Sequence, residues 1–164
     1  MRILAVCGSL QHSSANLSLL RTAIASAPEA VEMQLFQGLA ALPHFNPDLE
    51  RHETPAAVSE LRRLVAGCDA LLIAMPEYGH SLPGSLKNAI DWLIGSGELE
   101  GKLVAITSAV AGPLRGRLGL AALRTTLGAV SARVAFQEPI ARGPDFERQV
   151  AEMLDLLIAA ARGE

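Results

Sequence analysis

The chain has 164 residues, of which half are hydrophobic, and a formal net charge of −3 at pH 7. This length favours one domain over residues 1–164, with enough apolar residues for a sizeable core. Charges of both signs are mixed along the chain without a basic block, which argues against a nucleic-acid-binding surface. The apolar runs are far shorter than the ~20 residues that a membrane span needs, so we expect a cytoplasmic protein with no membrane contact.

The first predicted strand, residues 2–7, is an apolar run that ends at a glycine. A polar loop over residues 8–16 leads into a helix, with Ser14 as a favourable N-cap residue. Free backbone N–H groups at a helix start favour an anion, so the Ser9 and Ser14 hydroxyls and the Asn16 amide could donate to a phosphate. The same residues would suit an ordinary strand-to-helix turn with a serine cap. The loop has neither a Walker nor a Gly-x-Gly-x-x-Gly pattern.

The second predicted strand, residues 31–36, alternates apolar and polar residues, which is typical of an edge strand with one wet face. Residues 38–53 then form a long loop that could include a helical turn, and long ordered loops are often functional. The next helix is expected to begin with Pro55 at its first position and to end at Gly67.

The third predicted strand, residues 69–75, leads into the most distinctive stretch of the chain, residues 76–92, with the sequence PEYGHSLPGSLKNAIDW. Two prolines and two glycines separate the buried strand from the helix that follows. Ligands of open α/β sheets bind just beyond the carboxyl ends of strands, so this loop would present Glu77, Tyr78 and His80 to a ligand. The alternatives are that Glu77 is a solvated or turn-capping carboxylate, that the Tyr78 ring packs on its own loop, and that His80 is an ordinary loop residue.

The fourth predicted strand, residues 102–107, is followed by a loop of small residues from Ser108 to Gly112. Small residues let the backbone approach a flat ligand, although a plain tight connection would use them too. A helix is expected from about residue 115 to 127, with Gly128 as its C-cap. The remaining elements are a strand over residues 130–136, a loop over 139–144 and a helix over 146–161.

This alternation of strands and helices predicts an α/β fold with a five-stranded parallel sheet and helices on both faces. In a sheet of order 2-1-3-4-5, the loops after the first, third and fourth strands surround the switch point, which strengthens the prediction of a ligand site there. The sequence shows neither a catalytic triad nor histidines at metal-ligand spacing, so a bound cofactor is expected to carry any difficult chemistry. Cys7 and Cys68 are expected to be small core residues at strand ends, without a disulfide.

The two loop motifs resemble those of the NADPH-dependent FMN reductase family, which includes quinone, azo-dye and chromate reductases. The family's first pattern, Gly-Ser-x-Arg-x-x-Ser-x-Asn, is similar to GSLQHSSAN at residues 8–16. Its second pattern, PEYNxSxPGxLKNxxDW, is matched by residues 76–92 except at Gly79. Residues 42–48 also resemble the family's loop after the second strand. The resemblance covers nearly the whole chain and implies a flavodoxin-like three-layer sandwich of strand order 2-1-3-4-5.

The resemblance also implies an FMN site, with the phosphate on the first loop and the isoalloxazine ring between the later loops. The cofactor-binding residues that it implies are Ser9, Gln11, Ser14, Ala15, Asn16, Pro76, Glu77, Tyr78, Gly79, Ser108 and Gly112. His80 and Tyr78 are the only candidates for a catalytic role, and no metal is implied.

The implied activity is ping-pong hydride transfer from NADPH or NADH to FMN, and from FMN to a quinone-like or other small acceptor. The family's members are commonly homodimers or homotetramers, which would place residues 86–94 at an interface. Residues 42–51 and the partner subunit would form the outer wall that selects the acceptor. The alternative function is a non-enzymatic flavin or nucleotide binder, such as an electron carrier or a repurposed scaffold, with a weakened FMN site.

Two departures from the family pattern concern the flavin site itself. The family's phosphate-binding arginine is Gln11 here, and losing a charge-assisted contact costs ~1.5–3 kcal/mol, or roughly ten- to a hundredfold in affinity. Arg115 or Arg117 could replace this charge. Gly79 stands where the family has asparagine, which removes a side-chain amide near the ring or the loop backbone.

Overall fold

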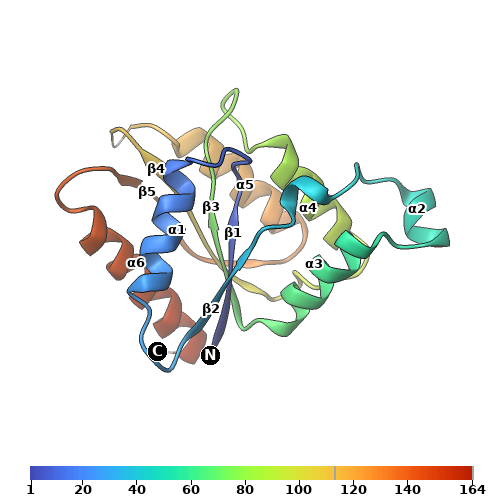
Figure 1. The fold of residues 1–164 in the computed structure, drawn as a ribbon, viewed down its shortest axis with the longest axis horizontal. Helices are drawn as coiled ribbons and strands as arrows, with labels where there is room; N and C mark the ends of the chain where they lie inside the picture. The colour runs from blue at the N-terminus through green and yellow to red at the C-terminus, as the bar shows by residue number, and fades with distance from the viewer. Residues whose placement is uncertain (113, 164) are drawn as a thin grey trace.

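Five parallel strands form one sheet at the centre of the molecule, with helices on both faces (Figure 1). The computed structural model describes residues 1–112 and 114–163. The strands are β1 (Arg2–Cys7), β2 (Glu32–Phe36), β3 (Ala70–Ala74), β4 (Leu103–Val110) and β5 (Arg133–Ala141). The helices are α1 (Ala15–Ala25), the 3-10 helix η1 (Leu39–Ala41), α2 (Pro47–His52), α3 (Ala56–Gly67), α4 (Gly84–Ile94), α5 (Arg117–Ala129) and α6 (Phe146–Arg162). The sheet order β2-β1-β3-β4-β5 confirms the predicted one.

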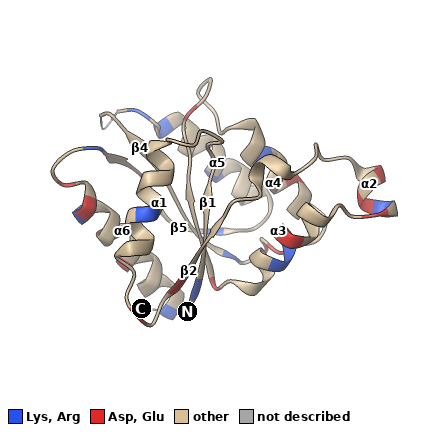
Figure 2. Ribbon diagram, viewed as in Figure 1, with Lys and Arg blue, Asp and Glu red and all other residues tan. Residues whose placement is uncertain are grey.

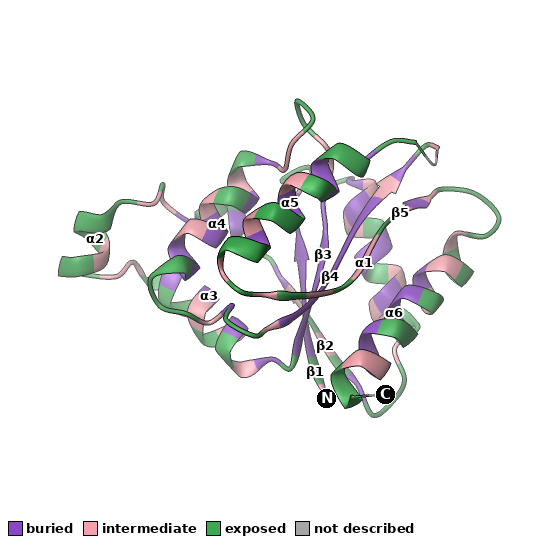
Figure 3. Cartoon of the chain, turned by 180° about the vertical axis from the view of Figure 1, so that it is seen from behind, coloured by how far each residue is buried: buried purple, intermediate pink, exposed green. Residues whose placement is uncertain are grey.

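The sheet separates two hydrophobic cores because successive side chains of a strand point to opposite faces. On β1, Ile3 and Ala5 pack with α1 and α6, whereas Leu4 and Val6 pack with α3, α4 and α5. Right-handed crossovers explain this division, since the chain moves from β1 to β2 and then returns to β3, β4 and β5. Figure 3 shows the inner strands as buried and the outer helix faces as exposed.

The fourth and fifth strands are longer than predicted. Residues 108–110 continue β4 and pair with residues 139–141 of β5, so the loops predicted to begin at Ser108 and at Pro139 begin three residues later. A proline is tolerated here because β5 is an edge strand, hydrogen-bonded on one side only. The small side chains that indicated a loop are accommodated in the sheet.

Several predicted boundaries also move. The long loop over residues 38–53 contains two helical segments, η1 and α2, rather than one turn. Pro55 is the N-cap of α3 and not its first residue. Gly128 lies inside α5, whose C-cap is Val130. A turn through Ser131, with a φ of +57°, then delays the start of β5 to Arg133.

The second half of the long motif anchors the segment after η1. The Asn88 Nδ2 and the Trp92 Nε1 both donate to the Pro43 carbonyl, at 2.9 and 2.8 Å, and the Asn88 Oδ1 accepts from the Phe45 N–H at 2.7 Å. The rings of Phe45 and Trp92 meet edge to face with centroids 5.1 Å apart. Asn88 and Trp92 therefore hold a distant loop in place.

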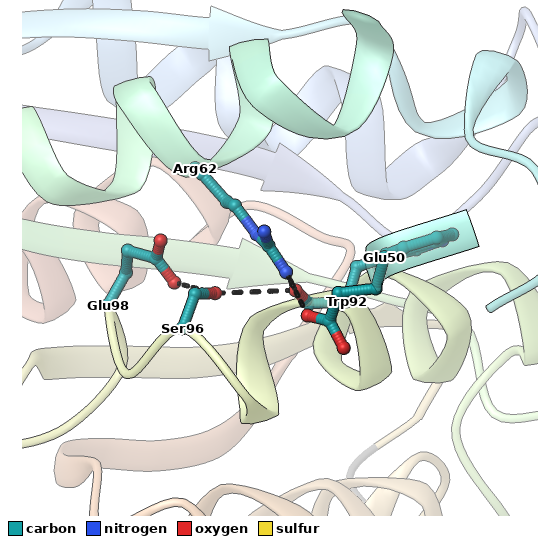
Figure 4. Close-up of polar contacts among 5 residues, drawn as sticks. All are labelled: Glu50, Arg62, Trp92, Ser96 and Glu98. Atoms are coloured by element: carbon teal, nitrogen blue, oxygen red, sulfur yellow. Dashed lines mark hydrogen bonds and ion pairs between the residues drawn. The ribbon is translucent and has the colours of Figure 1, made fainter. Parts of the chain in front are cut away.

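Arg62 on α3 joins two further elements, α2 and α4 (Figure 4). Its Nε and Nη2 donate to the Trp92 carbonyl near the end of α4, at 3.2 and 2.8 Å, and the same guanidinium pairs with Glu50 of α2. The Ser96 hydroxyl donates to this carbonyl and to Glu98, at 3.5 and 2.5 Å. A cation near the end of a helix satisfies free carbonyls and interacts favourably with the helix dipole. The Arg62 contact ties α2, which stands out at one end of the molecule in Figure 1, to the body of the fold.

Cys7 and Cys68 are buried free cysteines, as predicted. Burial raises the pKa of both thiols, which keeps them protonated and unreactive at neutral pH. Lysines, arginines and acidic residues are interspersed over the helices (Figure 2). None of the helices in the described part of the chain has both the length and the apolarity that a membrane span requires.

Candidate functional site

Hydrogen bonds link the segment after β1 to the ends of β3 and β4 at the carboxyl end of the sheet. The Gly8 N–H donates to the Ala74 carbonyl at 2.8 Å, and the Asn16 Oδ1 accepts from the Ala109 N–H at 2.8 Å. A Cβ on Gly8 would lie only 2.6 Å from the Cβ of Met75, so this close approach of two strand ends requires glycine. The three segments that the sequence places at this edge are thus joined in the structure.

The first loop is held by hydrogen bonds between its own hydroxyls and backbone. Ser14 is the N-cap of α1, and its Oγ accepts from the Asn16 N–H at 3.2 Å, while the Ser9 Oγ accepts from the Gln11 N–H at 3.3 Å. Asn16 is 4% exposed, and its contact with Ala109 uses only the amide oxygen. No acceptor among the described residues takes the hydrogens of its Nδ2, which therefore remains available to a ligand at the start of the helix.

The second loop is a tight hairpin turn, seen as the projection above β3 in Figure 1. Tyr78 and Ser81 exchange two backbone hydrogen bonds of 3.0 Å, and the central residues Gly79 and His80 have φ values of +56° and +60°. Two successive left-handed residues define a type I′ turn, which favours glycine or asparagine at the first central position. A Cβ on Gly79 would meet no atom within 4 Å, so the replacement of asparagine by glycine preserves the turn.

Glu77 connects this loop to α5. Its Oε2 accepts from the Gly119 N–H at 2.8 Å, and its Oε1 lies 3.3 Å from the His80 Nδ1. The Gly119 N–H, followed by His80, lowers the pKa of the Glu77 carboxyl against the opposing effect of burial. A Cβ on Gly119 would lie 3.1 Å from the Glu77 side chain and from Met75, which explains the glycine inside a helix. Glu77 therefore caps a backbone N–H in the first turn of α5, which is close to the turn-capping alternative.

We expect Glu77→Gln to lower the free energy of unfolding at pH 7 by about 1 kcal/mol, because it removes a negative charge from the start of α5. The pKa of Glu77 is lower in the folded chain than its ordinary value of 4.5, so the charge stabilises the fold above that pH and the effect is lost as pH falls through the folded pKa. Urea unfolding at pH 7 and pH 3 should show the difference shrink at pH 3. A difference equal at both pH values would contradict this, and Glu29→Gln, at an exposed turn carboxylate, is the control.

A cavity of about 560 Å³ opens between the second loop, the end of β4 and the start of α5. Its lining residues are Pro76, Glu77, His80, Ser108, Ala109, Val110, Ala111, Leu114, Arg115, Gly116, Leu118 and Arg142. This volume lies within the range of about 300–1,000 Å³ that is usual for sites of small molecules and cofactors. Ser108 is 2% exposed and faces this cavity, and its hydroxyl has no hydrogen-bond partner among the described residues. This free hydroxyl is reachable from the cavity and can donate to a ligand there, and a flat ring with polar edges fits this wall.

The structure separates the other predicted residues into groups. Tyr78, Gly79 and Gly112 do not line the large cavity, and the Tyr78 side chain is 57% exposed. Ser9 and Gln11 line another cavity, of about 220 Å³, on the β2 side of the first loop. Ala15 lines a further one, of about 380 Å³, on the β5 side. Residues 42–51 contribute nothing to the lining of the large cavity within one chain.

Gly119 and Arg142 are the site residues that the sequence analysis missed. A lone glycine between two leucines in a helical pattern signals a close contact, and this signal was present at Gly119. Arg142 follows directly after β5, at the edge where ligands of such sheets bind, but the strand was predicted to end at Phe136, five residues before its observed end at Ala141. Among the described residues, no group of three or more His, Cys, Asp or Glu side chains could hold a metal ion.

Comparison with known proteins finds relatives that are named as flavin and quinone reductases. A protein of Pseudomonas aeruginosa named NAD(P)H-dependent FMN reductase is 38% identical over 114 residues, which cover 68% of this chain and 61% of that protein. The quinone reductase of Escherichia coli K12 is 34% identical over 119 residues, covering 71% of this chain and 63% of the relative. The chain thus spans about three fifths of the length of these curated relatives.

The fold is shared with a solved structure, a flavoenzyme NAD(P)H:(acceptor) oxidoreductase from Paracoccus denitrificans. That structure has a TM-score of 0.77 and 24% identity, and the match covers 96% of this chain and 97% of that one. The sequence profile of the NADPH-dependent FMN reductases matches residues 1–143, which include both loop motifs and every residue that lines the large cavity. This match shows that the chain belongs to the NADPH-dependent FMN reductase family.

Proposed function

We propose that this chain is an FMN-dependent NAD(P)H oxidoreductase. It would take a hydride from NADPH or NADH and pass it, in a ping-pong reaction, to a quinone-like or other small acceptor. The observation that carries the proposal is the large cavity, which Ser108, with its free hydroxyl, lines together with Pro76 and Glu77. The printed names of the relatives support the same activity.

Two groups of residues would bind the two ends of FMN. Pro76, Glu77 and Ser108 would hold the ring, with the Ser108 hydroxyl as a donor to its polar edge. Asn16 and the start of α1 would hold the phosphate, since helix N-termini favour anions. Bound FMN supplies the hydride chemistry. The protein contributes position, and the Glu77–Gly119 contact fixes the loop that forms one wall.

His80 is the candidate for proton delivery, because it lines the cavity and its Nδ1 lies 3.3 Å from the Glu77 carboxylate. Tyr78 projects from the turn beside it and could cover a second substrate. A His80→Ala variant whose pH–rate profile equals that of the wild type would remove His80 from the reaction.

The test combines flavin binding with turnover. The purified protein is mixed with FMN, desalted and examined by visible spectroscopy, and NADPH oxidation is then measured with a quinone against a blank that contains flavin alone. Turnover above the blank supports the proposal, and no turnover with any flavin present would refute it. Bound flavin without turnover would instead indicate the non-enzymatic alternative.

We also propose a homodimer or homotetramer. The apolar residues Leu86, Ile90 and Leu93 of α4 pack in the chain's own core, whereas Ile94 is 55% exposed. An interface on this helix would therefore use Ile94 and the polar side that carries the Lys87–Asp91 ion pair. Light scattering on the purified protein gives its mass, and a monomer at all concentrations would exclude this assembly.

A further inference from the structure

We propose that Arg142 supplies the positive charge that the first loop lacks, and that its guanidinium binds the phosphate monoester of the flavin. The inference rests on the proposed function, since it assigns a residue to the cofactor of that site. A phosphate carries close to two negative charges at neutral pH, and arginine binds such groups through parallel N–H donors. The first loop has Gln11 where the family pattern has its arginine, so an arginine that contacts the phosphate would have to come from another part of the chain.

The backbone places Arg142 beside the first loop. Its N–H donates to the Val110 carbonyl at 2.9 Å, directly after β5 ends. The neighbouring residue, Ala109, donates to the Asn16 Oδ1 at 2.8 Å. Adjacent strands are about 4.8 Å apart, so the Arg142 backbone lies roughly one strand spacing from the residues that hold the start of α1. An arginine side chain is long enough to reach across this spacing.

Arg142 also lies between two cavities. It lines the large cavity together with Ser108, and it lines the cavity of about 380 Å³ together with Ser13, Ala15 and Ser18 of the first loop and α1. It is the one described residue that belongs to both linings. A cofactor with its ring in the first cavity and its phosphate at the start of α1 would pass this guanidinium.

The charge of Arg142 is available for a ligand. No described carboxylate lies within ion-pair distance of its guanidinium, whereas Arg117, one of the two arginines suggested by the sequence, is 3.7 Å from Glu138. The other, Arg115, lines the large cavity but not the cavity beside α1. Asn16 offers a donor at the same place, because its Oδ1 is held by the Ala109 N–H while its accessible Nδ2 has no described acceptor.

The experiment compares FMN with riboflavin, which has the same ring but no phosphate. Dissociation constants are measured by flavin fluorescence for the wild type, Arg142→Ala, Arg142→Lys and the control Arg21→Ala, an exposed arginine on the Gln11 side of the loop. We expect Arg142→Ala to weaken FMN binding by about ten- to a hundredfold and to leave riboflavin binding unchanged. Arg142→Lys should retain part of the preference for FMN, and Arg21→Ala all of it.

Each other outcome overturns the inference. Equal FMN binding by Arg142→Ala and the wild type would show that Arg142 does not contact the phosphate. Equal weakening of FMN and riboflavin would show that it acts through the fold. A selective loss in Arg21→Ala instead would place the phosphate on the β2 side. A wild type that binds neither flavin would refute the proposed function as well, which distinguishes that failure from failure of the assignment alone.

Discussion

Replacing Trp92 with alanine is expected to lower the free energy of unfolding by about 3–5 kcal/mol, the usual cost of truncating a large buried aromatic residue. Trp92 is fully buried, and the variant would lose the edge-to-face contact with Phe45 and the hydrogen bond to the Pro43 carbonyl. The remaining hole lies between α4 and the segment after η1, which is held there by this ring. Urea unfolding followed by far-ultraviolet circular dichroism measures the change, because the variant has no tryptophan to report it.

The control is Trp92→Phe. Phenylalanine keeps a ring against Phe45 but leaves the Pro43 carbonyl with only the Asn88 Nδ2 as donor, so we expect a smaller loss, about 1–2 kcal/mol. If Trp92→Ala cost no more than Trp92→Phe, the indole ring would contribute little packing energy, contrary to its burial.

Trp92 also shows that one recognisable motif can contain both residues that line the candidate site and residues that stabilise the fold. In the stretch over residues 76–92, Pro76, Glu77 and His80 line the large cavity, while Asn88 and Trp92 hold residues 43–45. The sequence identifies both sets equally well, because family patterns preserve structural and functional residues alike. Only the contacts separate them, and they place Asn88 and Trp92 away from the cavity.

Local signals predicted much of the fold. The apolar run at residues 2–7 is β1 to the residue, and Ser14 caps α1, because a glycine and a serine cap are strong local signals. The ends of β4 and β5 were missed because a strand continues where a neighbour pairs with it, and the pairing of Ser108 with Pro139 has no local signature. Glu77 and Gly119 are likewise 42 residues apart in sequence. Contacts of this kind define the candidate site, and they follow from the packing of the whole sheet.

Replacing Asn16 with aspartate is expected to weaken FMN binding by roughly a hundredfold or more, because it would set a carboxylate against the phosphate in a partly desolvated site. The fold should tolerate the change. An aspartate oxygen can accept the Ala109 N–H as the Asn16 Oδ1 does at 2.8 Å, and a negative charge in the first turn of α1 interacts favourably with the helix dipole. Urea unfolding and flavin titration of the same sample measure the two effects separately.

Asn16→Ala is the matched variant, because it removes the hydrogen bond between Asn16 and Ala109 without adding a charge. It leaves the partly buried Ala109 N–H without its acceptor, so we expect a loss of about 1–3 kcal/mol in the free energy of unfolding. Riboflavin binding should be unchanged in Asn16→Asp and reduced in Asn16→Ala, since only the second variant loosens the wall that Ala109 forms. If Asn16→Asp bound FMN as tightly as the wild type, Asn16 would be a purely structural link, and the phosphate would have to lie away from the start of α1.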